Sequence, residues 1–303
     1  MNYPTEKVFE HLRDIAARAF EQIHDLAARR KLIDQYFRVH PSTSEILGQS
    51  YPVRTGHIPM EWVVADGADP NRRILYIHGG SWISGSISGY RAFISRVSRA
   101  AKAAVLSVDY RLAPEHMFPA GLEDCVQAYR WMRENGPAGK EPAGATYLMG
   151  DSAGGNLALS ALLKVRDSWL ALPTAAIALS PATDFTCGSP SLVSRASVDP
   201  IINPAILPAL IPFYLGTNTQ PTDPYASPLF GDYSGMPPIL LQVGDAEVLL
   251  DDSTRLARHA SEQGCDVTLE VWNGMPHVFQ GFAPFLPEAT EAIAKIGEFV
   301  RQH

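Results

Sequence analysis

Residues 150–155, with the sequence GDSAGG, constrain this chain most, because they join a short apolar run to a stretch rich in Ala and Leu. This pattern predicts a strand, a sharp turn and a helix. Glycines two residues before and after Ser152 let the backbone bend tightly without a Cβ clash, so the serine hydroxyl stands clear of the sheet. The serine is therefore a candidate nucleophile, and the rest of the chain must corroborate it.

A second glycine motif, HGGSW at residues 78–82, follows the apolar run 73–77 upstream of the serine. It resembles the HGGG type of oxyanion loop, in which glycines after a strand leave backbone N–H groups free to face a developing alkoxide. The residue after the serine supplies a further N–H. The two motifs together predict an oxyanion hole made by Gly79, Gly80 and Ala153, whereas HGG alone would indicate only a tight turn.

A serine hydroxyl needs a general base at neutral pH, and nine histidines compete for that role. His277 lies in the loop NGMPHVF, directly after the alternating strand 267–272. A loop at the carboxyl edge of the sheet would bring it toward Ser152, so His277 is the predicted base. Solvated or structural positions are predicted for the others, which are His11, His24, His40, His57, His78, His116, His259 and His303.

The acidic partner of the histidine is expected among four carboxylates that follow the buried strand 238–243. Asp251 and Asp252 are predicted to begin the next helix, where unpaired N–H groups favour carboxylates. Asp245 and Glu247 remain, and either can accept the imidazole N–H and stabilise imidazolium. Spacing along the chain leaves both open.

Three motifs together resemble those of the bacterial hormone-sensitive-lipase-like (family IV) carboxylesterases in the α/β-hydrolase superfamily. They are HGGS at residues 78–81, DYRLAPE at 109–115 and GDSAGG at 150–155. That family places its acid in a D-P-L-x-D pattern, with which EVLLD at 247–251 aligns. The resemblance therefore implies Glu247 as the acid, as in the GDSAGG subgroup that uses glutamate, with Asp245 as the runner-up.

Alternating strands and helices from residue 73 onward predict an α/β protein with a mostly parallel sheet flanked by helices. The resemblance implies an α/β-hydrolase fold, with residues 46–185 and 235–303 as the catalytic domain. A helical cap is implied at residues 1–45, where apolar residues recur at helical spacing, and as an insertion at 186–234, where prolines are dense. One cap helix is predicted at about residues 204–214. Predicted substrate contacts are Trp82, Phe213 and Tyr214.

The net charge of −7 argues against nucleic acid or an anionic membrane surface as a partner, because both require clustered Lys and Arg. No stretch approaches the ~20 apolar residues of a membrane span. Residues 1–20 mix charged and apolar positions, unlike a secretion signal, so a cytoplasmic protein is expected. Cys125, Cys187 and Cys265 fit neither a disulfide framework nor a zinc site.

The function predicted from these features is a serine esterase. His277 would take the proton of Ser152 during attack on an ester, and water would then cleave the acyl-enzyme, so neither a metal nor an organic cofactor is needed. The resemblance implies short- to medium-chain acyl esters, from acetate to octanoate, and a homodimer formed through residues 266–300. A lactone or amide hydrolase is an alternative. A non-catalytic ligand receptor of the same fold is less favoured, because such receptors have lost the histidine.

Overall fold

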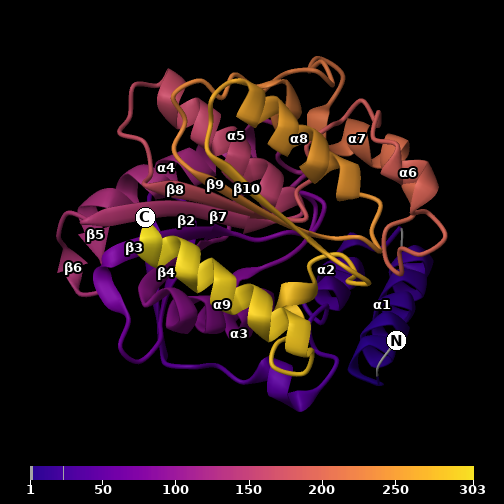
Figure 1. Cartoon of the computed structure of the whole chain (residues 1–303), viewed down its shortest axis with the longest axis horizontal. Helices are drawn as coiled ribbons and strands as arrows, with labels where there is room; N and C mark the ends of the chain where they lie inside the picture. Colours follow the sequence, from indigo (N-terminus) through magenta and orange to yellow (C-terminus); the bar gives the residue numbers. More distant parts are fainter. Residues whose placement is uncertain (1–2, 23) are drawn as a thin grey trace.

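The computed structural model describes residues 3–22 and 24–303, and it is built around one large twisted sheet (Figure 1). The strands of that sheet are β1 (Gln49–Thr55), β2 (Ile58–Val64), β3 (Asp69–Ile77), β4 (Ala103–Val108), β7 (Ala145–Asp151), β8 (Ala175–Leu179), β9 (Ile239–Gly244) and β10 (Val267–Trp272). A separate pair is formed by β5 (Asn135–Gly136) and β6 (Gly139–Lys140).

The eight strands lie in the order β1-β2-β4-β3-β7-β8-β9-β10. The pairs β1–β2 and β2–β4 are antiparallel, and the other pairs are parallel. The central strands β4, β8 and β9 are buried along their whole length, as expected for parallel strands covered on both faces. This is the mostly parallel sheet that the alternation of strands and helices predicts.

Helices cover both faces of the sheet (Figure 1). The α-helices are α1 (Tyr3–Glu21), α2 (Leu26–Ile33), α3 (Ile87–Ala101), α4 (Ala120–Glu134), α5 (Ala153–Asp167), α6 (Ser191–Ser194), α7 (Leu207–Leu215), α8 (Leu250–Glu262) and α9 (Pro287–Gln302). Short 3₁₀ helices are η1 (Pro41–Ser44), η2 (Pro204–Ile206), η3 (Pro228–Phe230) and η4 (Phe279–Phe282).

Two hydrophobic layers hold the helices to the sheet. On one face α4, α5 and α8 pack against the sheet, and on the other α3, α9 and part of α1 do so. Strand β3 contributes to both layers in alternation, with Leu75 and Ile77 on the first face and Ile74 and Tyr76 on the second. Each such fully buried aliphatic side chain stabilises the fold by roughly 1.5–3 kcal/mol.

The helix predicted at about residues 204–214 is two elements in the structure, η2 followed by α7. Proline explains the division. Pro204 and Pro208 fit the first turns of their elements, where the missing N–H is harmless, while Pro212 lies inside α7 and removes a backbone donor. The predicted strand 267–272 matches β10 at both ends, and the strand predicted before Ser152 continues to Asp151.

Two segments that are far apart in the sequence meet at one end of the sheet, where α1 and α2 lie near α6 and α7 (Figure 1). Ile15 and Ala19 of α1 and Leu32 of α2 form a small apolar cluster, and Ile201 packs against it. Both segments therefore border the carboxyl edge that carries the predicted site. None of the helices formed by residues 3–22 and 24–303 is long and apolar enough to cross a bilayer.

Candidate active site

Ser152 occupies the turn between β7 and α5 with φ +53° and ψ −120°, a region that is unusual for a residue with a side chain. Close backbone packing explains the flanking glycines. A Cβ at Gly150 would lie 2.2 Å from the carbonyl oxygen of Gly154, and one at Gly154 would lie 2.0 Å from that of Ile77. The turn therefore has the strained strand-to-helix geometry expected of a nucleophile elbow.

The structure brings His277 and Glu247 together. His277 Nδ1 lies 2.6 Å from Glu247 Oε2, and both side chains are buried. Glu247 follows β9 and His277 follows β10, so the parallel pairing of these neighbouring strands places the two loops at the same edge. Spacing along the chain left two carboxylates as candidates for the acid, and Glu247 is the one that contacts the imidazole of His277. Asp245 Oδ1 instead accepts the N–H of Gly274.

Ser180, immediately after β8, holds this pair in place. Its hydroxyl donates to Glu247 Oε1 at 2.6 Å and accepts the N–H of Val278 at 3.2 Å. The N–H of Gly244 donates to the same oxygen of Glu247 at 2.8 Å. Ser180 was not predicted from the sequence. Its position at the carboxyl end of a buried central strand could have indicated that it lies at the site.

The charge of the buried imidazole depends on its neighbours. Burial disfavours imidazolium, but the carboxylates of Glu247, Asp199 and Asp151 outweigh this effect, so the pKa of His277 is raised. Ser152 and His277 line one cavity. Within the described chain, these two side chains are not hydrogen-bonded to each other. In such sites the nucleophile and the base often form their hydrogen bond only when substrate binds.

The oxyanion loop differs from the prediction at Gly79. The N–H of Gly79 donates to Asp151 Oδ1 at 3.0 Å, so it does not face the space beside Ser152. By contrast, the N–H groups of Gly80, Ser81 and Ala153 donate to no residue in the described part of the chain. Sequence position alone could not reveal that the N–H of Gly79 is engaged, because Asp151 reaches it only in the folded chain.

Asp151 is a second residue that the sequence analysis overlooked, although it is the second residue of the GDSAGG motif. Its fully buried carboxylate accepts hydrogen bonds from Tyr76 at 2.7 Å and Tyr90 at 2.9 Å. Burial raises the pKa of this carboxyl, although the two tyrosine hydroxyls act in the opposite direction. A Cβ at Gly79 would lie 2.4 Å from Asp151 Oδ2. The position of the carboxylate therefore requires glycine at this point of the loop.

The DYRLAPE segment supports the oxyanion loop from the side. Tyr110 donates to the carbonyl oxygen of His78 at 2.9 Å, and its ring stacks on that of His78. The N–H of Ala113 donates to the carbonyl oxygen of Trp82 at 2.9 Å. Two of the three motifs that carry the family resemblance are thus in direct contact.

Ser152 and His277 open into a mostly apolar cavity of about 200 Å³. Its walls come from α1 and α2, from the oxyanion loop and from residues 182–211. Trp82 lines it, as predicted. Phe213 and Tyr214 do not line it: Phe213 is 53% exposed, whereas Tyr214 is only 3% exposed and stacks on Trp82. Both belong to α7, and the helix presents Leu210 and Ile211 to the cavity instead.

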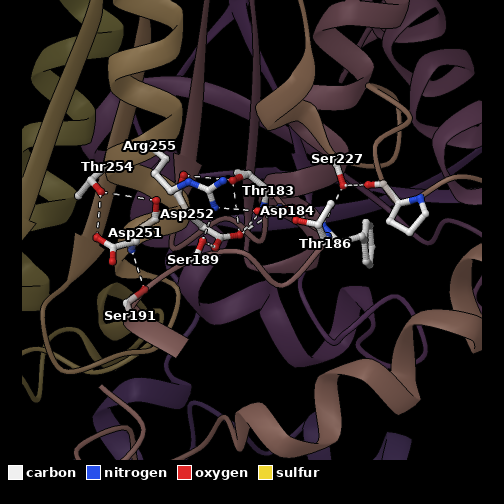
Figure 2. Close-up of polar contacts among 12 residues, drawn as sticks. Thr183, Asp184, Thr186, Ser189, Ser191, Ser227, Asp251, Asp252, Thr254 and Arg255 are labelled. Carbon is white, nitrogen blue, oxygen red and sulfur yellow. Dashed lines mark hydrogen bonds and ion pairs between the residues drawn. The ribbon is translucent and has the colours of Figure 1, made fainter. Parts of the chain in front are cut away.

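A buried polar cluster joins the wall of the cavity to α8, as Figure 2 shows. Asp252, in the first turn of α8, accepts hydrogen bonds from the N–H groups of Thr183 and Asp184 and from the hydroxyl of Ser189. Arg255 donates to Asp184 at 2.7 Å and to Ser189 at 2.9 Å. Asp252 begins the helix as predicted, but its side chain also ties down the segment before α6, and burial raises its pKa to about 6.

Two histidines predicted to be solvated make specific contacts instead. The Nε2 atom of His11 lies 2.9 Å from the carbonyl oxygen of Tyr36, and that of His259 lies 2.8 Å from the carbonyl oxygen of Gly231. Neither histidine is a neighbour of His277 in the sequence. Across residues 3–22 and 24–303, no group of three or more His, Cys, Asp or Glu side chains is arranged to hold a metal ion.

Comparisons with known proteins agree with this geometry. A family model described as alpha/beta hydrolase fold matches residues 74–281. The chain is 43% identical over 249 residues to an acetyl-hydrolase of Streptomyces hygroscopicus, covering 82% of this chain and 81% of that protein. It is 35% identical over 272 residues to an esterase of Acinetobacter venetianus, covering 90% and 88%.

Solved structures show the same relationship. The crystal structure of an esterase from the bacterial hormone-sensitive lipase family superposes with a TM-score of 0.90 at 39% identity, covering 100% of this chain and 98% of the other. Since the family match spans residues 74–281, which include the elbow, and this structure covers 100% of the chain at 39% identity, the chain belongs to the α/β-hydrolase fold family and, within it, to the bacterial hormone-sensitive lipase family of esterases.

Proposed function

We propose that this protein is a serine carboxylesterase that hydrolyses short- to medium-chain acyl esters through an acyl-enzyme at Ser152. The observation that carries the proposal is the buried pair His277–Glu247, with 2.6 Å between Nδ1 and Oε2, in the same cavity as the strained elbow serine. Membership of an esterase family supports the reaction class.

In the proposed reaction, Nε2 of His277 accepts the Ser152 proton while the serine oxygen attacks the ester carbonyl. Glu247 accepts the hydrogen bond from Nδ1, which fixes the tautomer and stabilises the imidazolium that forms. His277 then protonates the leaving alcohol. A water molecule then attacks the acyl-enzyme while the same imidazole takes its proton. The acid is released, and Ser152 is regenerated.

Gly80, Ser81 and Ala153 are the proposed donors to the oxyanion, since their N–H groups have no acceptor in the described chain. Each well-placed donor lowers the barrier by about 3 kcal/mol. Gly79 acts differently in this proposal: its bond to Asp151 holds the loop in the conformation that aims the next two N–H groups.

The size of the cavity supports a short acyl chain. Its volume of about 200 Å³ lies below the ~300–1,000 Å³ of sites that enclose drug-sized ligands. The acetyl-hydrolase of Streptomyces hygroscopicus, 43% identical to this chain, acts by its name on an acetyl group. Both observations favour acetyl to medium-chain esters over long-chain fats.

The division into catalytic domain and cap is part of the proposal. Residues 1–45 and 186–234 would form the cap, which is supported by the contact between α1, α2 and Ile201 and by the cavity walls that both segments supply. A homodimer through residues 266–300 is proposed as well. Strand β10 is an edge strand with a half-exposed Val271, so its unpaired backbone groups can pair with a second copy.

The test is hydrolysis of p-nitrophenyl esters from acetate to palmitate by wild type, Ser152→Ala and the exposed control Ser50→Ala. We expect a maximum at short chains and a loss of roughly 10³-fold or more in Ser152→Ala, because the nucleophile is removed. Ser50→Ala should match wild type. Equal rates for wild type and Ser152→Ala with every ester would refute the proposal and favour a non-catalytic ligand receptor.

A further inference from the structure

The helix α2 presents a positive charge to the active-site cavity. Leu26, Arg29, Arg30 and Ile33 lie at the spacing that places four residues on one face of a helix. That face points inward: Arg29 and Ile33 line the cavity that holds Ser152, and Leu26 packs against the aromatic cluster around Trp82.

Its two arginines differ in what they contact. Arg30 is fully engaged, because it donates to the carbonyl oxygens of Ile83 and Ala113 and pairs with Glu115 at 2.7 Å. The side chain of Arg29 makes no hydrogen bond or ion pair with any group of residues 3–22 and 24–303. Its Nε is buried without a partner, while its terminal nitrogens stay accessible.

No carboxylate nearby is free to neutralise Arg29. On the same stretch of chain, Asp25 accepts the N–H of Ala28 and Asp34 accepts the hydroxyl of Ser86. Among the described residues that line the cavity, Arg29 is the only Lys or Arg.

The carboxylates that do line the cavity are occupied as well. Asp151 accepts two tyrosine hydroxyls and a backbone N–H, Asp184 pairs with Arg255, and Asp252 accepts two backbone N–H groups and a serine hydroxyl. None of them is bonded to Arg29, so among the described residues its guanidinium has no carboxylate partner.

An unpaired charge in an apolar site is unfavourable unless something else supplies the opposite charge. Burial lowers the pKa of Arg29, but guanidinium is basic enough to remain charged at neutral pH. Its planar, multi-donor group matches the two oxygens of a carboxylate better than any neutral partner does.

We infer that Arg29 binds a carboxylate carried by the ester substrate, so that the preferred substrates are monoanionic esters. This inference rests on the proposed esterase function and specifies its substrate class. The carboxylate can belong to the acid half, as in a half-ester of a dicarboxylic acid, or to the alcohol half, as in an ester of a hydroxy acid. In both cases the ion pair orients the ester carbonyl toward Ser152.

The experiment for the acid half compares mono-p-nitrophenyl adipate with p-nitrophenyl hexanoate, which has the same chain length and no charge. The quantity measured is the ratio of kcat/KM for the two esters, after subtraction of spontaneous hydrolysis. Because a hydrogen-bonded charge pair is lost, Arg29→Gln should lower this ratio about tenfold or more.

The experiment for the alcohol half compares the butyrate ester of 4-hydroxybenzoate with that of 4-hydroxybenzamide, an uncharged analogue of nearly the same shape. The ratio of kcat/KM for the charged and the uncharged ester is again measured. It should fall about tenfold or more in Arg29→Gln for the pair of esters whose acid or alcohol half carries the recognised carboxylate. Adipate should also inhibit hexanoate hydrolysis competitively, and about tenfold more weakly in Arg29→Gln.

Two further variants separate charge from shape. Arg18→Gln removes an exposed arginine of α1 outside the cavity and should leave both ratios as in wild type. Arg29→Lys retains the charge and should keep more of the ratio than Arg29→Gln. An equal fall in the lysine and glutamine variants would overturn the inference, since the loss would then come from packing.

The possible failures can be told apart. If wild type hydrolyses hexanoate but neither ratio changes in Arg29→Gln, the inference about Arg29 is wrong and the esterase proposal stands. If wild type hydrolyses no ester above the Ser152→Ala background, the proposed function itself fails.

Discussion

At the scale of single residues, the proposed chemistry rests on a buried imidazole and a buried carboxylate that are 2.6 Å apart. Glu247 can orient His277 because both of its oxygens are held, one by the imidazole and the other by Ser180 and Gly244. Asp245 is only two residues away, but it is bonded to Gly274. The carboxylates around the imidazole also set the pH at which it can act as a base.

Glu247→Gln should reduce kcat by about 10³- to 10⁴-fold, because an amide cannot hold the imidazole in the required tautomer or stabilise imidazolium. Asp245→Asn is the matched control and should retain most of the activity. These rates are measured with p-nitrophenyl butyrate under saturating conditions. A larger loss in Asp245→Asn than in Glu247→Gln would reverse the assignment of the acid.

The same variant should change the pH dependence. Only neutral His277 can accept the serine proton, so the rate rises with pH through the raised pKa of His277. Glu247→Gln removes a carboxylate that raises this pKa, so the midpoint of kcat/KM against pH should move to lower pH. An unchanged midpoint would mean that another group controls the profile.

At the scale of elements, the segment between β8 and α6 is joined to the start of α8 through Asp252 (Figure 2). The same segment forms part of the cavity wall. A single carboxylate therefore links the position of the wall to the helix that follows Glu247, the proposed acid.

Asp252→Asn should change how stability depends on pH. The pKa of Asp252 is about 6 in the folded protein and about 3.9 in an unfolded chain, so the folded state holds a proton between these values and the unfolded state does not. The free energy of unfolding of wild type therefore falls, relative to Asp252→Asn, by about 3 kcal/mol as pH rises through this window.

This difference is measured by urea denaturation of both proteins at several pH values between 4 and 7. Other titrating groups are common to the two proteins and cancel in the comparison. Parallel stability curves would show that Asp252 ionises in the folded protein as it does in the unfolded chain.

At the scale of the whole molecule, the amino-terminal segment contacts the loop that carries His277 directly. The hydroxyl of Tyr36 donates to the carbonyl oxygen of His277 at 2.8 Å across 241 residues of sequence. The amino-terminal segment thus lines the cavity through α1 and α2, and it supports the backbone of the predicted base through Tyr36, which follows α2.

Tyr36→Phe should destabilise the protein by about 1–3 kcal/mol, because a buried carbonyl loses its donor. It should also lower kcat severalfold, since the loop that carries His277 is less well held. Tyr3→Phe, at an exposed position of α1, is the control and should change neither quantity. Thermal unfolding and butyrate hydrolysis provide the two measurements; a stability loss with unchanged kcat would limit Tyr36 to a structural role.

Much of the architecture could be predicted from local sequence. The elbow at Ser152, the loop at residues 78–82 and the strand 267–272 all follow from short-range rules, because glycine spacing and side-chain alternation act on neighbouring residues. The helix in the proline-rich stretch could be predicted less well. It divides at residue 207, because the position of a proline within a turn decides whether the helix continues.

Other features depended on contacts between distant segments, which short-range patterns do not specify. Spacing leaves Asp245 and Glu247 open and the family resemblance implies Glu247, but the contact itself forms only where the loop after β9 meets the loop after β10. Gly79 looks like any oxyanion donor until the fold places Asp151 beside its N–H. Arg29 belongs to an ordinary helix in the sequence, and only the tertiary packing of that helix places its unpaired side chain in the cavity that Ser152 lines. Hydrogen bonds and ion pairs form over a few ångströms, so tertiary structure decides which group has a partner.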